Sequence, residues 1–424
     1  MQNELYKKLE INNFWNRDVP HLGYIRDIYI DSLKKYLDNN LIKVLIGQRR
    51  AGKSYIMKQL ISYLMKERQV KPENILYINF ELEDFLEIDN EAKLGEVISL
   101  YIERNKPIGK FYLFFDEIQN VSGWERIINS YRANDNFDVE IFLTGSNSHL
   151  LSSELSTYIS GRYVEKNIYP FSYEEYLDFY NVSNSKEHFI NFINFTGIPE
   201  LYNLPNKELQ DSFLKSLKDT ILLKDIVKRY RIKEVDLLEK LLHFIVDNTA
   251  KLFSLNSITN KLKSIGIKTN PVTVGNYLKY IENTFLTYSI DRFDIKGKNI
   301  LEGSKKYYLG DLGFANFMLS SFDNNITRKL ENYVFNFLKY KGYKVYTGNI
   351  GDLEIDFVAE KEDKKIYIQV AYVLYDEKVI QREYGNLEKI KDNWPKYVIS
   401  MDEINIPNKE GITHIKAWEI GKYL

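Results

Sequence analysis

The chain has 424 residues, of which 44% are hydrophobic and 28% are charged, with a formal net charge of −1 and no cysteine. This composition describes a globular protein of about two to four domains. It excludes a disordered chain, a strongly basic protein, and disulfide, thiol or thiolate-metal chemistry, which fits a reducing cytoplasm. No apolar run reaches the ~18 residues of a membrane span, so we expect no membrane contact, and any nucleic-acid affinity must come from a local basic patch.

The first predicted elements lead into a phosphate-binding loop. Residues 25–33 are expected to begin a helix, in which Arg26 is interpreted as a solvent-exposed charge rather than a nucleotide contact. An apolar strand at residues 41–46 then runs into the spacing G-x-x-x-x-G-K-S, whose backbone amides surround phosphates. We predict a nucleotide-binding site at Gly47, Gln48, Arg49, Arg50, Ala51, Gly52, Lys53, Ser54 and Tyr55.

The residue types of this loop have separate physical roles. Gly47 and Gly52 permit a tight turn, and the Lys53 ammonium reaches the β- and γ-phosphates. The Ser54 hydroxyl is a ligand for Mg²⁺. The helix expected over residues 53–68 directs its positive dipole end at the phosphates. The sequence therefore predicts a protein that binds ATP and Mg²⁺.

Two carboxylates end the next buried strand. After an alternating strand at residues 74–80 and a helix at 91–103, an apolar run at 110–118 contains Asp116 and Glu117. Open α/β sheets hold ligands at the carboxyl ends of their strands. We expect Asp116 to hold Mg²⁺ through its water shell, the Walker B role, and Glu117 to be the general base that polarises the attacking water. The additional strand in between predicts a sheet in which the P-loop strand and the Walker B strand are not neighbours.

The following strand, expected at residues 139–147, has polar residues at its tip. Either Ser146 or Asn147 is a candidate sensor of the γ-phosphate from beside the two carboxylates, and Asn147 is included among the predicted catalytic residues.

Arg162 is a candidate catalytic residue of a different kind. It stands between a helix expected at residues 149–159 and a fifth strand at 163–168. In ring-forming ATPases an arginine at this position stabilises transition-state charge in the neighbouring subunit. A helix-end charge or an ion pair within the chain is the alternative.

Several runs of the sequence together resemble one bacterial and archaeal family. They are G-x-R-R-x-G-K-S at 47–54, F-F-D-E-I-Q at 114–119, L-T-G-S-x-S-x-L-L-S-x-E-L at 143–155 and S-G-R at 160–162. Members of this family are AAA+-like ATPases with an N-terminal P-loop domain. Their C-terminal domain of unknown function resembles PD-(D/E)xK nucleases. The resemblance covers nearly the whole chain from about Arg26 onward and implies architecture more than physiological role.

The middle of the chain is expected to hold a helical lid and a winged-helix module. Residues 171–234 have a helical pattern that G-I-P at 197–199 interrupts. Residues 235–310 contain three helical stretches and two β-like segments, the order of a winged helix, whose third helix can enter a major groove. This segment is locally basic through Lys261, Lys263, Lys268, Lys279, Lys296 and Lys298. DNA is therefore a predicted partner, with a purely protein-binding module as the alternative.

Residues 311–424 have the order α-β-β-β-α-β of a restriction-endonuclease-like core. In that core an acidic residue on the second strand and E/Q-x-K on the third hold Mg²⁺ and position a water. Period-two alternation places Glu354 beside Asp356 on one face of its strand and Gln369 on one face of the next. Glu331 on the first helix can add a ligand. We predict a degenerate nuclease site of Glu331, Asp356 and Gln369.

The reason for predicting a degenerate site is that the lysine position is occupied by Ala371. Alanine has no group that can position a nucleophilic water. Tyr372 and Lys364 are the residues considered as replacements.

The predicted fold is an α/β protein in four parts. These are a P-loop ATPase core of the ASCE/AAA+-like class at 1–170, a helical lid at 171–234, a winged-helix-like domain at 235–310 and a nuclease-like domain at 311–424. The predicted function is Mg²⁺-dependent ATP hydrolysis coupled to movement of the later domains on DNA, with a homo-oligomer as a candidate assembly. The alternatives are a nucleotide-gated switch or docking protein with slow turnover and an ATP-regulated DNA nuclease.

Overall fold

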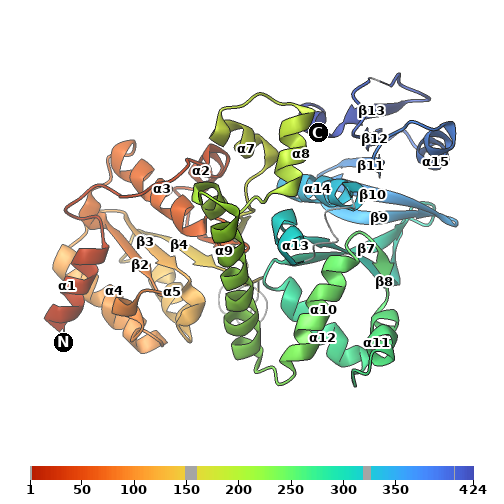
Figure 1. The fold of residues 1–424 in the computed structure, drawn as a ribbon. Coiled ribbons are helices and arrows are strands. Elements are labelled where there is room, and N and C mark those ends of the chain that lie inside the picture. The colour runs from red at the N-terminus through yellow and green to blue at the C-terminus, as the bar shows by residue number, and fades with distance from the viewer. Residues whose placement is uncertain (1, 149–159, 319–325, 405) are drawn as a thin grey trace. The chain divides into compact units, whose positions relative to one another are not determined.

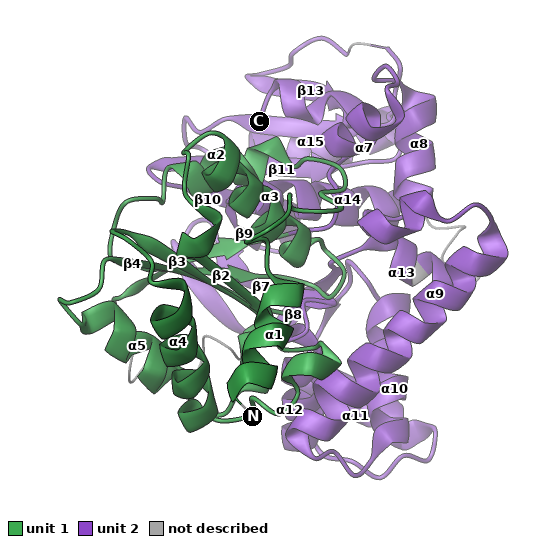
Figure 2. Ribbon diagram, turned by 90° about the vertical axis from the view of Figure 1, so that its left-hand side faces the viewer, with its two compact units in different colours: residues 1–168 green, residues 169–424 purple. Residues whose placement is uncertain are grey.

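The computed structural model describes residues 2–148, 160–318, 326–404 and 406–424. They form two compact units, unit 1 (residues 1–168) and unit 2 (residues 169–424), which have separate colours in Figure 2. The helix expected at residues 149–159 lies outside the described residues. No helix in the described part of the chain combines the length and apolar character needed to cross a bilayer.

Unit 1 is a five-stranded parallel sheet with helices on both faces (Figure 1). Its elements are α1 (Gln2–Asn12), α2 (Asp27–Lys34), β1 (Ile42–Ile46), α3 (Lys53–Lys66), β2 (Ile75–Asn79), α4 (Glu91–Asn105), β3 (Phe111–Asp116), α5 (Trp124–Ala133), β4 (Val139–Gly145) and β5 (Tyr163–Asn167). In Figure 1, α2 and α3 cover one face, and α1, α4 and α5 cover the other.

The strand order of unit 1 is β2-β3-β4-β1-β5. Strands β1, β3 and β4 are buried along their whole length, as expected for parallel strands covered on both faces. Strand β4 separates β1, which leads into the P-loop, from β3, which ends at Asp116. The prediction that these two strands are not neighbours is therefore confirmed.

The N-terminal segment covers the outer edge of β2. The Trp15 indole donates a hydrogen bond to the Ile75 carbonyl oxygen at 2.7 Å, and the Asn13 side-chain oxygen accepts one from the Tyr77 amide at 2.7 Å. These bonds satisfy an edge that would otherwise be open to pairing. The sequence did not predict α1, because Leu9 is its one buried residue and leaves no apolar stripe. The covered edge fixes Tyr77, which contacts the site described below.

Unit 2 combines helices with a second sheet. Its main elements are α7 (Tyr173–Tyr180), α8 (Lys186–Asn194), α9 (Lys207–Thr220), a π-helix (Ile221–Lys228), α10 (Val235–Asp247), β6 (Leu252–Phe253), α11 (Leu255–Ser264), α12 (Pro271–Glu282), β7 (Thr287–Asp294), β8 (Asn299–Leu309), α13 (Leu312–Met318), α14 (Ile326–Tyr340), β9 (Lys344–Ile350), β10 (Leu353–Lys361), β11 (Lys364–Val370), α15 (Glu377–Glu388), β12 (Lys396–Ser400) and β13 (Ile412–Lys416).

One eight-stranded sheet in the order β13-β12-β11-β10-β9-β7-β8-β6 runs through this unit. Three helices followed by the β7–β8 hairpin occur in the expected order, but β7 pairs in parallel with β9 through Arg292 and Thr347, among others. The hairpin thus belongs to the same sheet as strands β9 to β13, and the boundary expected at residue 310 falls within that sheet. A local strand pattern does not reveal such a long-range partner, and the winged-helix identity stays a prediction.

Candidate nucleotide site

The P-loop has glycine at two positions where the backbone requires it. A Cβ on Gly47 would lie 2.0 Å from the Ile168 carbonyl oxygen, so no side chain fits there. Gly52 precedes α3 with φ +96°, a left-handed conformation that glycine adopts without strain. The first amides of α3 have no acceptor within the helix and are free to bind phosphate oxygens.

Lys53 is buried inside this loop. Its Nζ donates to the carbonyl oxygens of Gly47 at 2.9 Å and Gln48 at 3.1 Å, and lies 3.8 Å from Glu117 Oε1. Neither the oxygen nor the nitrogen of the buried Gln48 amide has a hydrogen-bond partner among the described residues. Such a group costs free energy unless a polar ligand satisfies it. The loop therefore fits the phosphates of a nucleotide.

Arg26 supports the loop, and its interpretation as a solvent-exposed charge was wrong. The residue is 2% exposed, and its guanidinium donates to the Ala51 carbonyl oxygen at 2.9 Å. The same group lies 4.5 Å from the centre of the Tyr29 ring. A helix pattern alone does not show that a distant loop packs against the start of that helix.

The other predicted loop residues are placed as follows. Arg49 Nη1 donates to Glu81 Oε1 at 3.1 Å, and Arg50 is exposed with φ +67°. The Tyr55 ring lies against Gly23 and is 43% exposed. Their contacts with nucleotide stay predictions.

Asp116 is fully buried and accepts hydrogen bonds from two hydroxyl groups. Tyr77 donates to Oδ2 at 3.0 Å and Thr144 donates to Oδ1, while the nearby Ser54 hydroxyl helps to hold down the pKa of the carboxyl group. Burial, and then the neighbouring Glu117, raise the pKa of Asp116. A bound cation would oppose this effect, since it favours the ionised carboxylate. The fold brings Ser54 and Asp116 close together. A site with only two protein ligands suits Mg²⁺, because this ion usually keeps several of its water ligands.

Glu117 has a left-handed backbone conformation with φ +55°, which costs a non-glycine residue roughly 1–2 kcal/mol. The Glu117 backbone amide donates to Thr144 Oγ1 at 2.9 Å, and Glu117 Oε2 accepts a hydrogen bond from the Gln119 side-chain amide. Strained residues of this kind cluster at functional sites. The carboxylate lies beside the Lys53 ammonium, where a general base for an attacking water is expected.

Thr144 is a site residue that sequence reasoning missed. Phe115 pairs with Leu143 in the parallel register, so Thr144 lies next to Asp116. Its hydroxyl donates to Asp116 and accepts from the Glu117 amide. A polar residue at the end of an apolar strand was a visible signal in the sequence. Its role could be recognised only with the knowledge that β4 pairs with β3, which ends at Asp116.

We expect Thr144→Val to lower kcat about tenfold with little change in ATP affinity, since it removes the hydrogen bonds of Thr144 to Asp116 Oδ1 and to the Glu117 backbone amide. Thr144→Ser keeps the hydroxyl and is the matched control, expected near the wild-type rate. Steady-state ATP hydrolysis and equilibrium binding measure the two quantities. A wild-type kcat for Thr144→Val would contradict a positioning role.

The two candidate sensors are both buried. Gln119 Nε2 lies 3.5 Å from Ser146 Oγ and also donates to Glu117, so Ser146 is linked to the candidate base through Gln119. Asn147 follows directly and is 0% exposed. A role for either in sensing the γ-phosphate stays a prediction.

Arg162 lies where strand β1 begins, whereas the P-loop of the same chain follows the end of that strand. Its carbonyl oxygen accepts from the Ile42 amide at the start of β1, and its Nη1 donates to Asn129 of α5 at 3.0 Å. The five residues of β1 separate Arg162 from the loop by about 15 Å. An arginine side chain cannot span that distance.

The three residues of the predicted nuclease-like site converge in unit 2. Lys306 on β8 contacts both Glu331 and Asp356, and Gln369 Oε1 accepts from the Asp356 amide at 2.7 Å. Sequence reasoning missed Lys306, because it precedes the nuclease-like segment. The considered replacements are elsewhere: Tyr372 is 42% exposed, and Lys364 begins β11 at the end away from Gln369.

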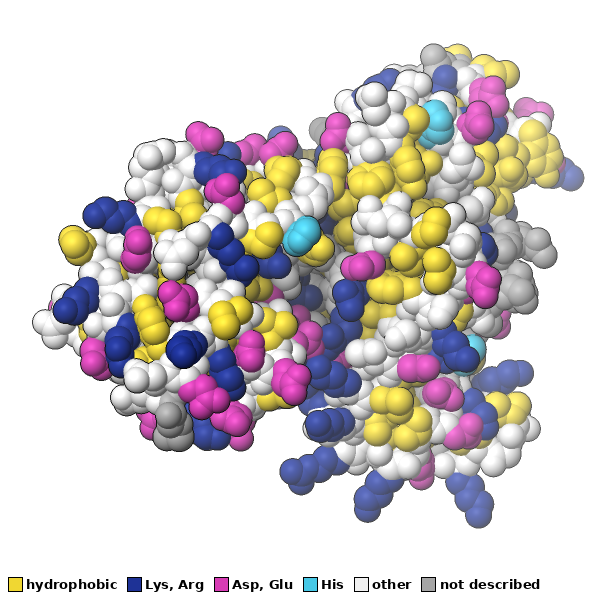
Figure 3. Space-filling model, turned by 60° about the vertical axis from the view of Figure 1, so that its left-hand side comes forward, with side chains coloured by type: hydrophobic (Ala, Val, Ile, Leu, Met, Phe, Trp, Pro, Cys, Tyr) yellow, Lys and Arg dark blue, Asp and Glu magenta, His cyan; other side chains and the backbone are white. Residues whose placement is uncertain are grey.

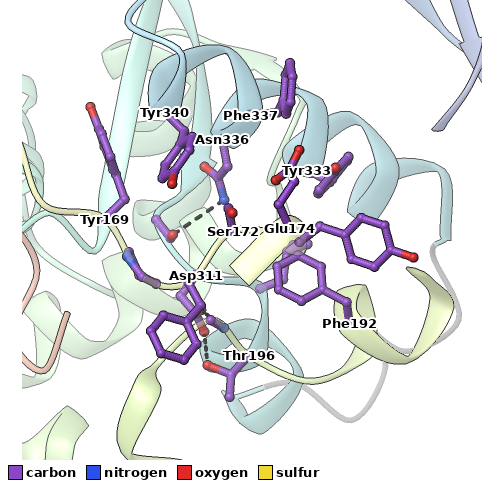
Figure 4. A pocket seen from close by; sticks show the side chains of 16 residues that line it. Tyr169, Ser172, Glu174, Phe192, Thr196, Asp311, Tyr333, Asn336, Phe337 and Tyr340 are labelled. Carbon is purple, nitrogen blue, oxygen red and sulfur yellow. Dashed lines mark hydrogen bonds between the residues drawn. The ribbon is translucent and has the colours of Figure 1, made fainter. Parts of the chain in front are cut away.

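Unit 2 also contains a cavity of about 60 Å³ with aromatic walls (Figure 4). Phe192, Tyr333 and Phe337 line it, and at its floor the Thr196 hydroxyl donates to Asp311 at 2.7 Å. Small-molecule sites usually have volumes of about 300–1,000 Å³. This cavity is therefore too small for a nucleotide.

Comparison with known proteins agrees with the geometry of unit 1. A family model described as an AAA domain matches residues 39–177, and a model for a domain of unknown function matches residues 186–325. The Walker-type ATPase of Pyrococcus abyssi has a similar structure, with a TM-score of 0.50 and 16% identity over 70% of this chain and 96% of that one. Both family models end before β9, so the nuclease-like domain stays a prediction.

Two relatives match most of the chain. An uncharacterized protein of Haemophilus influenzae is 35% identical over 88% of this chain and 92% of its own length. An uncharacterized protein of Methanocaldococcus jannaschii is 33% identical over 89% of this chain and 84% of its own length.

Unit 1 therefore has the P-loop, the carboxylates at the end of β3 and the strand order of an AAA domain of the P-loop ATPase type. The chain belongs to the family that contains these Haemophilus and Methanocaldococcus proteins.

Proposed function

We propose that this protein hydrolyses ATP with Mg²⁺ and couples hydrolysis to conformational changes of unit 2 that act on DNA. The observation that carries the proposal is the meeting of the P-loop with the end of β3. There Lys53 Nζ lies 3.8 Å from Glu117, and the Ser54 hydroxyl lies near the buried Asp116 carboxylate. Phosphate binding alone does not need a carboxylate on a strained backbone beside Lys53. Activation of a water molecule needs such a carboxylate, and Glu117 supplies it.

In the proposed mechanism Lys53 and the loop amides bind the β- and γ-phosphates. Mg²⁺, held by Ser54 and Asp116, would neutralise phosphate charge. Glu117 orients the attacking water and accepts its proton. Thr144 fixes the geometry of both carboxylates through its hydroxyl.

Support for DNA comes from the charge of unit 2. The basic residues predicted for the winged-helix part are all exposed; they are Lys261, Lys263, Lys268, Lys279, Lys296 and Lys298. Figure 3 shows Lys and Arg side chains projecting at the lower right, over the part of unit 2 formed by α10, α11 and α12. Lysines that neutralise phosphates give affinity that falls with salt. We also propose that unit 2 is divided into a helical lid, a winged-helix-like part and a nuclease-like part.

ATP turnover by the full chain, measured without DNA and with duplex, forked and single-stranded DNA, tests the coupling. Stimulation by one of these DNAs, lost as salt is raised, is the expected result. Slow turnover that is indifferent to every DNA would instead favour a nucleotide-gated switch.

We further propose that Arg162 acts on the site of a neighbouring copy of the chain, since the P-loop of its own chain is out of reach. Mixing Arg162→Ala subunits with Lys53→Ala subunits should restore part of the ATPase activity that each lacks alone. The restored activity comes from sites with an intact P-loop from one subunit and an intact arginine from the other. Full hydrolysis by a protein that stays monomeric with ATP, Mg²⁺ and DNA would contradict this role.

A further inference from the structure

One ammonium group, that of Lys306, lies where three carboxylates of unit 2 converge. Lys306 on β8 is 2% exposed. Its Nζ lies 2.7 Å from Glu354 Oε1, 2.9 Å from Glu331 Oε1 and 3.7 Å from Asp356 Oδ1. The hydroxyl of Tyr308, on the same strand, donates to Glu331 at 2.7 Å. Strand β8 therefore supplies the positive charge for carboxylates from α14 and β10.

Asp356 and Gln369 have further protein partners in this cluster. Asp356 Oδ2 accepts from the Val370 amide at 2.8 Å. Gln369 accepts from the Asp356 amide through Oε1 and donates through Nε2 to Glu383 at 2.8 Å. Gln369 is thus oriented by two hydrogen bonds, and its oxygen is directed at a backbone amide.

A divalent metal ion does not fit this arrangement. No group of three or more His, Cys, Asp or Glu side chains in the described residues is spaced to hold one. An ammonium at the point of convergence would repel a second cation at contact distance. The carboxylates of a nuclease site have to surround the metal, but here they surround Lys306.

The charge states favour the same conclusion. Burial lowers the pKa of Lys306, but the attraction of Glu331, Asp356 and Glu354 outweighs burial and raises it above the ordinary value, so the ammonium persists.

We propose that Lys306 is a built-in cation that replaces the divalent metal of a nuclease site, so that this part of unit 2 binds no catalytic metal and cleaves no DNA. An ammonium carries one charge and cannot activate a bound water as a metal ion does. Its contacts tie the β7–β8 hairpin to α14 and β10. The hairpin, α14 and β10 are therefore expected to move as one body, whether or not nucleotide is bound in unit 1.

Counting bound Mn²⁺ by electron paramagnetic resonance on the full chain without nucleotide tests this proposal. Lys306→Met keeps the side-chain length but removes the charge. The variant should bind one more Mn²⁺ per chain than the wild type. Its affinity for Mn²⁺ at this cluster should be at least about tenfold higher than that of the wild type. The control is Lys305→Met, since Lys305 is more exposed and pairs with Asp291 at 3.0 Å. It should leave the count unchanged.

Removal of the ammonium should also lower the thermal midpoint of Lys306→Met by roughly 10 °C, because it leaves buried carboxylates without their partner. Added Mn²⁺ should restore much of this loss in Lys306→Met and have no such effect in Lys305→Met. An unchanged Mn²⁺ count in folded Lys306→Met would overturn the proposal.

The wild type provides a test that does not depend on the folding of Lys306→Met. Glu354 is the most exposed of the three carboxylates, so Glu354→Gln is expected to fold. Equal Mn²⁺ counts in the wild type and Glu354→Gln support the proposal, and loss of one ion in Glu354→Gln overturns it. The wild type should leave plasmid, linear and branched DNA intact with Mg²⁺ or Mn²⁺, with or without ATP. Cleavage that disappears in Asp356→Ala would also overturn it.

Discussion

Glu117→Gln should bind ATP with nearly wild-type affinity and hydrolyse it at least about 100-fold more slowly. Glutamine preserves the size of the side chain but cannot accept the proton of the attacking water. The backbone bond from residue 117 to Thr144 does not involve the side chain, so the left-handed turn should persist. Equilibrium binding of a fluorescent ATP analogue and single-turnover phosphate release measure the two effects separately.

The control for this substitution is Glu83→Gln, which removes one negative charge from an exposed position of the same unit. It should hydrolyse ATP at close to the wild-type rate. Equal hydrolysis by Glu117→Gln and the wild type would show that another group is the base.

Lys53→Ala should weaken ATP binding at least about 100-fold, since truncating one member of a buried, charge-assisted interaction costs about 2–5 kcal/mol. Its ammonium is buried within hydrogen-bonding distance of two P-loop carbonyl oxygens. Phosphate oxygens would replace these neutral acceptors as much stronger partners. Calorimetric titration with ATP and Mg²⁺ measures the change.

Lys66→Ala is the matched control, since Lys66 is an exposed lysine in the last turn of the same helix. It removes the same charge from α3 and should leave the affinity unchanged. Near-normal ATP affinity in Lys53→Ala, with the fold intact by circular dichroism, would refute the assignment of the phosphate-binding loop.

The P-loop and the carboxylates could be predicted from the sequence because their signals are local. The glycine spacing fixes the turn, and Lys53 and Ser54 follow it directly in the chain. The apolar run before Asp116 predicted β3 to within a residue or two of its observed bounds. Parallel strands place their carboxyl ends together, so these local signals also predicted where the side chains would meet.

The contacts that support the site could not be predicted in this way, because they depend on long-range neighbours. Tyr77 and Thr144 reach Asp116 only because β2 and β4 flank β3. Arg26 reaches Ala51 through the packing of a preceding segment against the loop. None of these residues belongs to a motif with fixed spacing.

Lys306 shows the same limit in unit 2. The period-two pattern predicted that Glu354 and Asp356 share one face, and both carboxylates contact Lys306. The interpretation of Ala371 as a missing catalytic lysine stays a prediction. The positive charge comes instead from β8, which lies beside β7 in the sheet, while β7 pairs with β9. A pattern within residues 311–424 contains no information about a strand outside that range.

Phosphate release from ATP by the purified full chain tests the assignment of ATPase activity most directly. We expect release with Mg²⁺ that stops when EDTA removes the cation, and no release above background from Lys53→Ala prepared in the same way. Wild-type release no greater than that of Lys53→Ala, with Mg²⁺ present and with or without DNA, would contradict ATP hydrolysis at this site.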